Sequence, residues 1–494
     1  MVNSSGKPEF EDVPLTGEAF PHDHAKLPAE IPQTGDRGIR LADVVNGKNT
    51  LEEFTAQLTD YDLSCIIRGE GMGSPKVTAG TAAAFGGVSD TLTALGIPCA
   101  CCDDGPSGMR LDCGTKAFSL PNGTLLASTF DRPLMTELFT FMGLEMHTNQ
   151  VDCLLGPGMN IHRHPLNGRN FEYFSEDPYL TGEMASAELA GLHSTGAEGT
   201  IKHFCGNNRE TRRHFLDSVI SERALREIYL RGFENAVKKG GAKSVMTTYG
   251  QVNGVWTAGN YDLVTGILRD DWGFDGFTMT DWWANINRRG KAPDKSDFAA
   301  MAMAQNDVYM VTADGAACND NTLDSLKSGE LTRGELQRNA MNILRFLTTT
   351  HAMKRVMGCD DETEIINRPA DAGDVDSTDI EFHDIDEDLT LDLTGITTEK
   401  GSSYAFGLNV SKPGVYKVTL TASSTLSELA QTSVSIFALG SPCGMFTFNG
   451  TGGAPVSQTK DVKCLSNFMP IRLYFGGSGL KTQSIRFELK ERWT

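Results

Sequence analysis

Two short apolar runs, SVMTTYG at residues 244–250 and FTMTDWW at residues 277–283, indicate the fold of this chain. Each has the length and composition of a buried strand and ends in polar or aromatic residues. An amphipathic segment, SERALREIYLRGFENAV, precedes the first run at residues 221–237. We expect it to form one helix, because its apolar residues fall on one face at helical spacing: Leu225, Ile228, Tyr229, Phe233, Ala236 and Val237.

The same alternation extends outward over residues 97–349. Its other apolar runs are IPCACC (97–102), VDCLLGP (151–157), TIKHF (200–204) and DVYMV (307–311). A capping box, Thr50 with Glu53, predicts a short helix before them. Strands that alternate with helices over about 250 residues are typical of an α/β fold, and a (β/α)8 TIM-like barrel is its common closed form.

The chain changes character after the barrel. Residues 359–388 are strongly acidic, with Arg368 as their only Lys or Arg, and indicate a solvated linker. The period then becomes two, as in Tyr416, Val418, Leu420 and in Ile485, Phe487, Leu489, which predicts an all-β sandwich. The expected domains are an N-terminal linker (1–48), the barrel (49–358), the acidic linker (359–388) and the sandwich (389–494).

Charge and termini limit the partners. The net charge of −20 repels phosphate backbones and anionic lipids, so we expect neither nucleic acid nor membrane as a partner. The first residues, MVNSSGKPEFEDVP, lack the features of a signal peptide, which favours a cytoplasmic protein. The oligomeric state stays open, with a homo-oligomer as one option.

Neither a metal nor a cofactor is expected. The eleven cysteines lack zinc-type spacing, and Cys99, Cys101 and Cys102 lie in an apolar run typical of buried, reduced thiols. His162 and His164 have no third ligand nearby in the sequence. The glycine-rich GEGMGS at Gly69 does not follow a predicted strand, so it is not a dinucleotide-binding fingerprint.

Polar residues collect where the predicted strands end. In a barrel of this kind the carboxyl ends of the strands meet at one face, which carries the chemistry. Carboxylates and cations there can bond sugar hydroxyls, and aromatic rings can pack on the apolar face of a pyranose. The pattern therefore indicates a polyhydroxylated ligand. The strand-end residues are Asp103, Asp104, Arg110, Arg169, Glu172, Lys202, His203, Met246, Tyr249, Asp281, Trp282 and Trp283.

Several stretches resemble the barrel motifs of family-three glycoside hydrolases, the β-glucosidase family, in the family's order. They are DGPSGMR, LLGPGMNIHRHPLNGRNFEYFSEDPYLTGE, TIKHFCGNNRE, SERALREIYLRGFENAVK, SVMTTYGQVNG and DDWGFDGFTMTDWW, within residues 50–350. The chain is most similar to the barrel portion of the branch with permuted domain order. KHFCGNN differs from the loop that is typical of the N-acetylglucosaminidase branch.

The resemblance implies a retaining mechanism in which Asp281 attacks the anomeric carbon. We expect positive neighbours such as Lys202 to lower the pKa of Asp281 and keep it ionised. Trp282 would form an apolar wall. The sugar-binding residues that the resemblance implies are Asp104, Arg110, Arg169, Lys202, His203, Arg213, Met246, Tyr249 and Trp282.

One necessary group is missing from the predicted site. A retaining glycosidase also needs a carboxylic acid about 5–5.5 Å from the nucleophile. In the family that glutamate usually comes from an α/β-sandwich domain, which this sequence does not contain. Glu172 and Glu176 are nearby in the sequence, but the resemblance gives their motif a structural role. We therefore expect the acid to come from another domain or chain.

The function predicted is an exo-β-glycosidase, most simply a β-glucosidase acting on terminal non-reducing β-D-glucosyl residues of a β-glucoside or oligosaccharide. The alternatives are a β-xylosidase, a phosphorolytic enzyme, and a sugar-binding subunit with little turnover of its own. In the sandwich, four aromatic residues could contact sugar, although core packing is the expected role of most of them: Phe446, Phe448, Tyr474 and Phe475.

Overall fold

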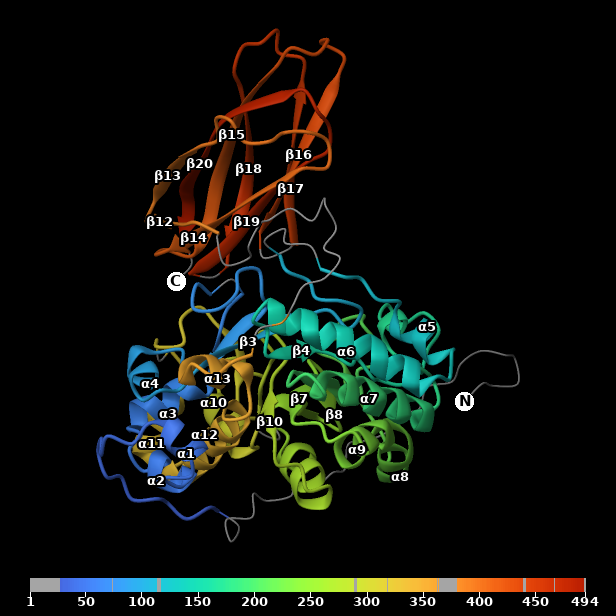
Figure 1. Cartoon of the computed structure of the whole chain (residues 1–494), viewed down its shortest axis with the longest axis vertical. Helices are drawn as coiled ribbons and strands as arrows, with labels where there is room; N and C mark the ends of the chain where they lie inside the picture. The colour runs from blue at the N-terminus through green and yellow to red at the C-terminus, as the bar shows by residue number, and fades with distance from the viewer. Residues whose placement is uncertain are drawn as a thin grey trace.

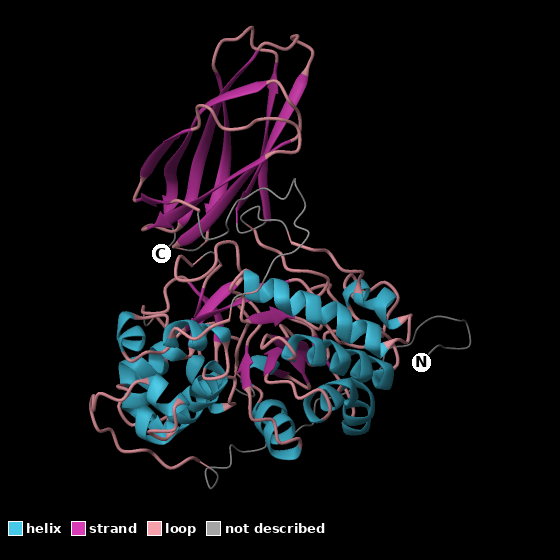
Figure 2. Cartoon of the chain, viewed as in Figure 1, coloured by secondary structure: helices cyan, strands magenta, loops and turns pink. Residues whose placement is uncertain are grey.

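A computed structural model gives the fold of the chain (Figure 1). It describes residues 27–72, 74–112, 117–287, 291–317, 319–361, 363, 380–438, 441–465 and 467–492. The described residues form a large barrel and a smaller C-terminal β domain, drawn orange to red, which stands over one end of the barrel. The colours of Figure 2 separate the mixed helices and strands of the barrel from the strands of the β domain.

Eight strands form the barrel in the order β10-β7-β5-β4-β3-β2-β1-β11. A parallel bridge between Met279 and Val308 joins the two outer strands of this order, so the sheet closes on itself. Neighbours are parallel, except that β2 runs antiparallel to β1 and β3. The strands are β1 (Arg68–Glu70), β2 (Ala83–Gly86), β3 (Cys99–Asp104), β4 (Cys153–Leu155), β5 (Glu198–Phe204), β7 (Ser244–Thr247), β10 (Phe277–Met279) and β11 (Tyr309–Thr312).

Each of the six apolar runs contains a barrel strand, but the sequence pattern did not predict β1 and β2. Both precede residue 97, where the predicted alternation of strands and helices begins. β1 is hard to predict because it is only Arg-Gly-Glu; its Arg68 is fully buried and pairs with Asp320 at 2.6 Å. A charged side chain can enter a core when a distant partner neutralises it, and a local pattern contains no sign of that partner.

Helices cover the outside of the barrel (Figure 2). The capping box is confirmed: the Thr50 hydroxyl accepts from the Glu53 N–H at 3.1 Å, and the Glu53 carboxylate accepts from the Thr50 N–H at 3.0 Å. The helices are α1 (Leu41–Val45), α2 (Leu51–Thr55), α3 (Asp60–Ile66), α4 (Asp90–Ala94), α5 (Gly123–Ala127), α6 (Arg132–Thr148), α7 (Pro178–His193), α8 (Glu222–Ala224), α9 (Arg231–Lys238), α10 (Phe298–Met303), α11 (Thr322–Ser328), α12 (Arg333–Leu347) and α13 (His351–Met357).

The single helix predicted over residues 221–237 is divided by a π-helical turn. Between α8 and α9, η3 (Leu225–Tyr229) has the i→i+5 bond from the Leu230 N–H to the Leu225 carbonyl. The wider turn changes the phase of the helix, so Ile228 faces solvent with 42% of its surface exposed, while Phe233 and Ala236 are buried. The prediction that Ile228 shares the buried face is therefore wrong. Other irregular turns are η2 (Asn170–Glu172), η4 (Thr257–Gly259) and the π-helix η5 (Asp262–Asp271).

The C-terminal β domain consists of two sheets with one core between them. Their orders are β12-β14-β19-β16-β17 and β13-β20-β15-β18. Phe446, Phe448 and Phe475 are buried in the core, whereas Tyr474 is exposed. The strands are β12 (Phe382–Ile385), β13 (Asp388–Asp392), β14 (Ser403–Val410), β15 (Gly414–Ser424), β16 (Gln431–Ala438), β17 (Ser441–Asn449), β18 (Val456–Cys464), β19 (Phe468–Phe475) and β20 (Leu480–Arg492).

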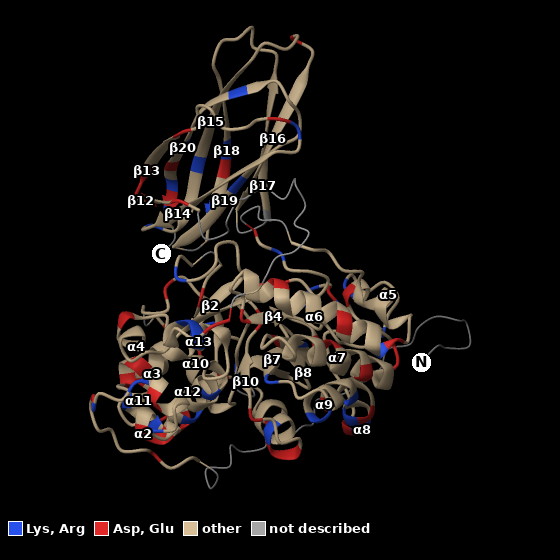
Figure 3. Ribbon diagram, viewed as in Figure 1, with Lys and Arg blue, Asp and Glu red and all other residues tan. Residues whose placement is uncertain are grey.

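A small additional sheet, the cysteines and the charged residues complete the description of the fold. A small sheet beside the barrel mouth contains β6 (Asp217–Ser218), β8 (Gln251–Val252) and β9 (Val255–Trp256). Cys101 and Cys102 are free thiols buried in β3, as the apolar run predicts. Figure 3 shows acidic and basic residues interspersed along the outer helices. Among the described residues, every helix is too short or too polar to cross a bilayer.

Candidate active site

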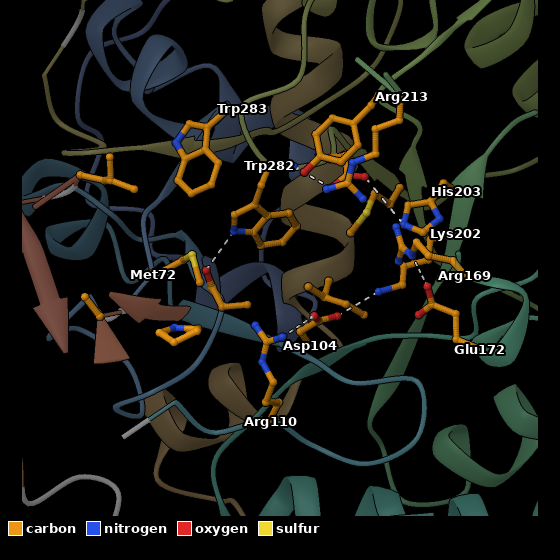
Figure 4. Close-up of a pocket in the computed structure, with 18 of the residues that line it drawn as sticks. Met72, Asp104, Arg110, Arg169, Glu172, Lys202, His203, Arg213, Trp282 and Trp283 are labelled. Atoms are coloured by element: carbon orange, nitrogen blue, oxygen red, sulfur yellow. Dashed lines mark hydrogen bonds and ion pairs between the residues drawn. The ribbon is translucent and has the colours of Figure 1, made fainter. Parts of the chain in front are cut away.

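A cavity of about 760 Å³ opens where the carboxyl ends of the barrel strands meet. All ten site residues that the sequence predicts line it, and Figure 4 shows many of them converging on it. Parallel strands bring their carboxyl ends to one face, which explains why residues far apart in sequence gather here. The ten are Asp104, Arg110, Arg169, Lys202, His203, Arg213, Met246, Tyr249, Asp281 and Trp282.

The two oxygens of the Asp281 carboxylate have different environments. Asp281 follows β10 after one residue and is 6% exposed. Its Oδ1 accepts a hydrogen bond from the backbone N–H of Trp282 at 2.8 Å. Its Oδ2 is buried and has no hydrogen-bond partner among the described residues; the nearest cation-forming group is His203 Nε2, 3.7 Å away. One oxygen is thus held in place and the other is available to a ligand.

The pKa of Asp281 differs in direction from the prediction. Burial raises the pKa of this carboxyl above its usual value, while Arg169, the Trp282 N–H, Lys202 and Arg213 oppose part of the rise. The positive neighbours do lower the pKa as expected, but burial raises it by more, so the net shift is upward and not downward. Removing a carboxylate from water destabilises its charged form, and in this site that cost exceeds the attraction of the cations.

Lys202 and Asp104 form an ion pair at the floor of the cavity. The Lys202 ammonium donates to Asp104 Oδ1 at 2.9 Å, and Arg110 lies 3.6 Å from the other carboxylate oxygen. Burial alone would raise the pKa of Asp104, but Lys202 and Arg110 lower it to about 2. Asp104 is therefore a permanent anion near neutral pH and a strong acceptor for hydroxyl groups.

His203 is oriented from behind by a chain of hydrogen bonds. Asn207 Nδ2 donates to the Tyr173 hydroxyl at 2.9 Å, and that hydroxyl lies 3.1 Å from His203 Nδ1. Burial and then Arg169 lower the pKa of His203 well below its usual value, so the ring is neutral. Because Asn207 already donates to the Tyr173 hydroxyl, we infer that this hydroxyl donates to Nδ1 and that Nε2 carries the proton, toward Asp281 and the cavity. Asn160 brackets the His203 backbone with two bonds of 2.9 Å.

Both arginines on the far side of the cavity are held by carboxylates. Arg169 Nε donates to Glu172, and Arg213 donates to Glu210 at 2.9 Å. The Arg213 guanidinium also lies over the ring of Tyr249, 4.4 Å from its centroid. Burial and the charge of Asp281 raise the pKa of Tyr249, so its hydroxyl keeps its proton and can donate it to a ligand oxygen or to Asp281.

An irregularity in β5 allows two residues that are adjacent in sequence to line the same cavity. Lys202 and His203 are adjacent in sequence, and regular strands direct adjacent side chains to opposite faces. The register of β5 with β7 shifts between Ile201 and Phe204, however, and both intervening side chains line the cavity.

Several lining residues were missing from the predicted site. The sequence predicts Trp283 as a strand-end residue but not as part of the sugar site. Its backbone is left-handed, with φ 55°, a strained conformation for a bulky side chain. The Trp283 N–H donates to the Met310 carbonyl at 2.6 Å, which holds the strained turn. Tyr173 and Asn207 orient His203 through hydrogen bonds. The sequence does not show the direction of these two side chains, so it could not predict this role. Met72 and a group of residues from the C-terminal β domain also line the cavity.

The carboxylates around the cavity do not include an obvious proton donor. Of the described residues, Asp104, Glu172, Asp281 and Asp461 line it. Asp104 and Glu172 are ion-paired with cations of the cavity, and Asp461 pairs with Lys490 at 2.6 Å. A general acid must hold its proton until the leaving group departs, and the lowered pKa of Asp104 favours the opposite state.

One group with metal-binding potential lies elsewhere, beside the N-terminal end of β5. It consists of His147, His351 and Asp360, whose ligand atoms lie within 4.8 Å of one another. His351 Nδ1 contacts Asp360 at 2.6 Å and its Nε2 contacts the Thr195 carbonyl at 2.8 Å. These contacts already satisfy the ring, so the group acts as a tie between α13, α6 and the loop before β5.

Residues 36–346 match the glycosyl hydrolase family 3 N-terminal domain, and this chain belongs to that family. A β-glucosidase of Ruminococcus albus is 60% identical over the whole chain, which covers 54% of the relative. A β-glucosidase structure from Paenibacillus barengoltzii has a TM-score of 0.66 and 45% identity, covering 94% of this chain and 50% of its own. β-Glucosidase 3B of Thermotoga neapolitana, solved with glucose, has a TM-score of 0.57 and 36% identity over 63% of this chain and 44% of its own.

The lengths of these proteins bear on what this chain contains. It spans about half the length of the relatives that it matches. The site around Asp281 lies within the matched family domain. The strand–helix barrel predicted from the sequence is the fold of this family domain, apart from the antiparallel β2.

Proposed function

We propose that this chain carries the sugar-binding and nucleophile half of a retaining β-glucosidase. The observation that carries the proposal is the asymmetric Asp281 carboxylate, with Oδ1 held by a backbone N–H and Oδ2 buried but unbonded at the cavity. A carboxylate in this state can attack a sugar carbon without first breaking a bond of its own. The names of the relatives support glucose as the sugar.

In the proposed first step, Asp281 Oδ2 forms a bond to the anomeric carbon while the bond from that carbon to the leaving-group oxygen breaks. The leaving oxygen takes a proton from a general acid. Water then attacks the same carbon, gives its proton to the conjugate base of that acid, and releases Asp281. His203 Nε2–H, Asp104 and Lys202 would bond the sugar hydroxyls, and Trp282 would cover the apolar face of the ring.

We infer that the acid comes from an α/β-sandwich, either as a further domain or as another chain. The ion pairs of Asp104, Glu172 and Asp461 favour this inference. We also interpret the two-sheet C-terminal domain as the predicted β-sandwich. Its strand β12 lies within 359–388, so we propose that this domain begins at β12 rather than after the acidic linker.

The test is intact-mass spectrometry after incubation with dinitrophenyl 2-deoxy-2-fluoro-β-glucoside, followed by peptide mapping. Dinitrophenolate leaves without acid assistance, so the adduct should form on Asp281 even in this chain alone. Asp281→Asn should form none while retaining its fold. An adduct on another residue, or an equal adduct on Asp281→Asn, would refute the assignment of the nucleophile.

Substrate comparison tests the remaining parts of the proposal. The chain alone should release dinitrophenol from an unfluorinated glucoside but leave cellobiose intact, because cellobiose needs the acid. Sugar binding without any adduct would instead favour the binding-subunit alternative. The β-xylosidase alternative predicts faster labelling by the fluoroxyloside than by the fluoroglucoside, and a phosphorolytic enzyme predicts a phosphate-dependent rate.

A further inference from the structure

The cavity is larger than one sugar ring requires, and one side of it belongs to the C-terminal β domain. Cavities of 300–1,000 Å³ hold drug-sized ligands, and this one measures about 760 Å³. In Figure 4 the orange-red strands of the β domain come in beside Met72, across from the charged group around Asp104. We call this side the outer wall: Met72, Trp283, Pro442, Cys443, Asp461, Lys463 and Leu465.

The β domain is fixed against the barrel at this point. Met72 packs against both the barrel core and the core of the β domain. Burial raises the pKa of Asp112 in the barrel, and Arg472 of the β domain is among the charges that oppose the rise. A separate apolar cluster joins the two parts: Ala79 and Leu111 with Ile380, Phe382 and Ala405. These contacts hold the outer wall in a fixed position relative to the barrel.

The outer wall differs in chemistry from the charged inner site. Trp283, Met72, Pro442 and Leu465 contribute apolar surface, which suits the face of a ring. Lys463 is two residues from Asp461 on β18, so both side chains leave the same face of the sheet.

The two charged residues of the wall are not equivalent. Asp461 is paired with Lys490 at 2.6 Å. The Lys463 ammonium, by contrast, makes no ion pair with any residue in the described ranges, although it lines the cavity. An apolar surface with one available cation at its rim fits a ring that carries oxygen substituents.

We propose that the outer wall is the leaving-group subsite, and that the C-terminal β domain thereby selects leaving groups that contain a ring bearing oxygen substituents. The inference rests on the proposed function, which places the glucosyl ring at Asp281. In this proposal, the ring of the leaving group packs on the apolar residues of the outer wall, and Lys463 donates to its oxygen substituents.

Two labelling reagents with the same sugar separate this subsite from the glucosyl site. In 2-deoxy-2-fluoro-β-glucosyl fluoride the leaving group is one atom and does not reach the outer wall. In the dinitrophenyl reagent it is a substituted ring that does. The variant is Lys463→Ala/Leu465→Ala in the full chain. Lys460→Ala, on the same strand but outside the cavity lining, is the matched control.

The double variant should be labelled about tenfold more slowly by the dinitrophenyl reagent, a loss typical of removing a few pocket contacts. Its labelling by the glucosyl fluoride should stay within about twofold of the unchanged chain, as should both rates for Lys460→Ala. Both variant positions are solvent-exposed, so the fold should survive, which thermal unfolding checks. Equal slowing with both reagents, or none with either, would overturn the proposal.

A measurement without bond cleavage keeps the two proposals distinguishable. If neither reagent labels Asp281 in the unchanged chain, the proposed nucleophile fails. Calorimetric titration with phenyl 1-thio-β-glucoside and with glucose then decides the subsite alone. The double variant should lose affinity for the thioglucoside while keeping that for glucose; an unchanged ratio of the two affinities would reject the outer wall as a binding surface.

Discussion

Replacing Asp104 by Asn should destabilise the fold by a calculable amount. The ordinary pKa of this carboxyl is 3.8, and its neighbours lower it to about 2 in the folded chain. Such a change contributes at most about 2 kcal/mol at neutral pH. Because 34% of the side chain is exposed, solvent screening reduces this to about 1 kcal/mol. The buried Lys202 also loses its partner, which raises the expected loss to about 1–3 kcal/mol.

The pH dependence has a definite sign. A carboxyl whose pKa is lowered on folding stabilises the fold above its unfolded pKa, and this stability is lost as the pH falls through the folded pKa. The difference between the unchanged chain and Asp104→Asn should therefore be full at pH 5–7 and shrink between about pH 4 and pH 2. Calorimetric unfolding across this range measures it, with a fall in Tm of roughly 1–5 °C at pH 7.

Asp112→Asn provides the matched control, because Asp112 contacts the same Arg110 at 3.3 Å. Burial raises the pKa of Asp112, so the fold disfavours its charge and Asn should leave stability at pH 7 unchanged or higher. Glucose titration adds a second readout, since loss of a charged acceptor should weaken binding about tenfold or more. If both variants lose equal stability, or if Asp104→Asn loses none, the ion-pair argument is wrong.

Three further outcomes follow from the buried groups. Because burial raises the pKa of Asp281, its labelling rate should fall as the pH drops through a value above the usual carboxyl range; a profile flat down to pH 4 would contradict this. Tyr173→Phe removes the hydroxyl beside His203 and should slow labelling about tenfold with little change in Tm. Burial raises the pKa of Glu188 well above its usual value. The free energy of unfolding should therefore fall as the pH rises from about 4.3 toward the raised pKa of the folded chain. In a calorimetric pH series, Glu188→Gln should make this fall smaller.

Local patterns predicted much of the fold and the membership of the cavity. The six apolar runs were found as strands because burial of both faces leaves a continuous apolar signature in the sequence. Asp281, Lys202 and Tyr249 could be placed together because each lies at or just after the carboxyl end of a strand, and these ends share one face. β1 could not be found in this way, since it depends on the pairing of Arg68 with Asp320, 252 residues away.

The sequence by itself determined six of the eight barrel strands, the net negative charge and the identity of the residues near the ends of those strands, because each of these follows from local periodicity and composition. Only the tertiary structure decided how those residues behave. Whether Asp281 has a raised or lowered pKa depends on how completely water is removed from it, and which of its oxygens is free depends on one backbone N–H. The β domain became a wall of the same cavity because Met72 contacts both cores, and a contact between distant segments has no periodic signal in the chain.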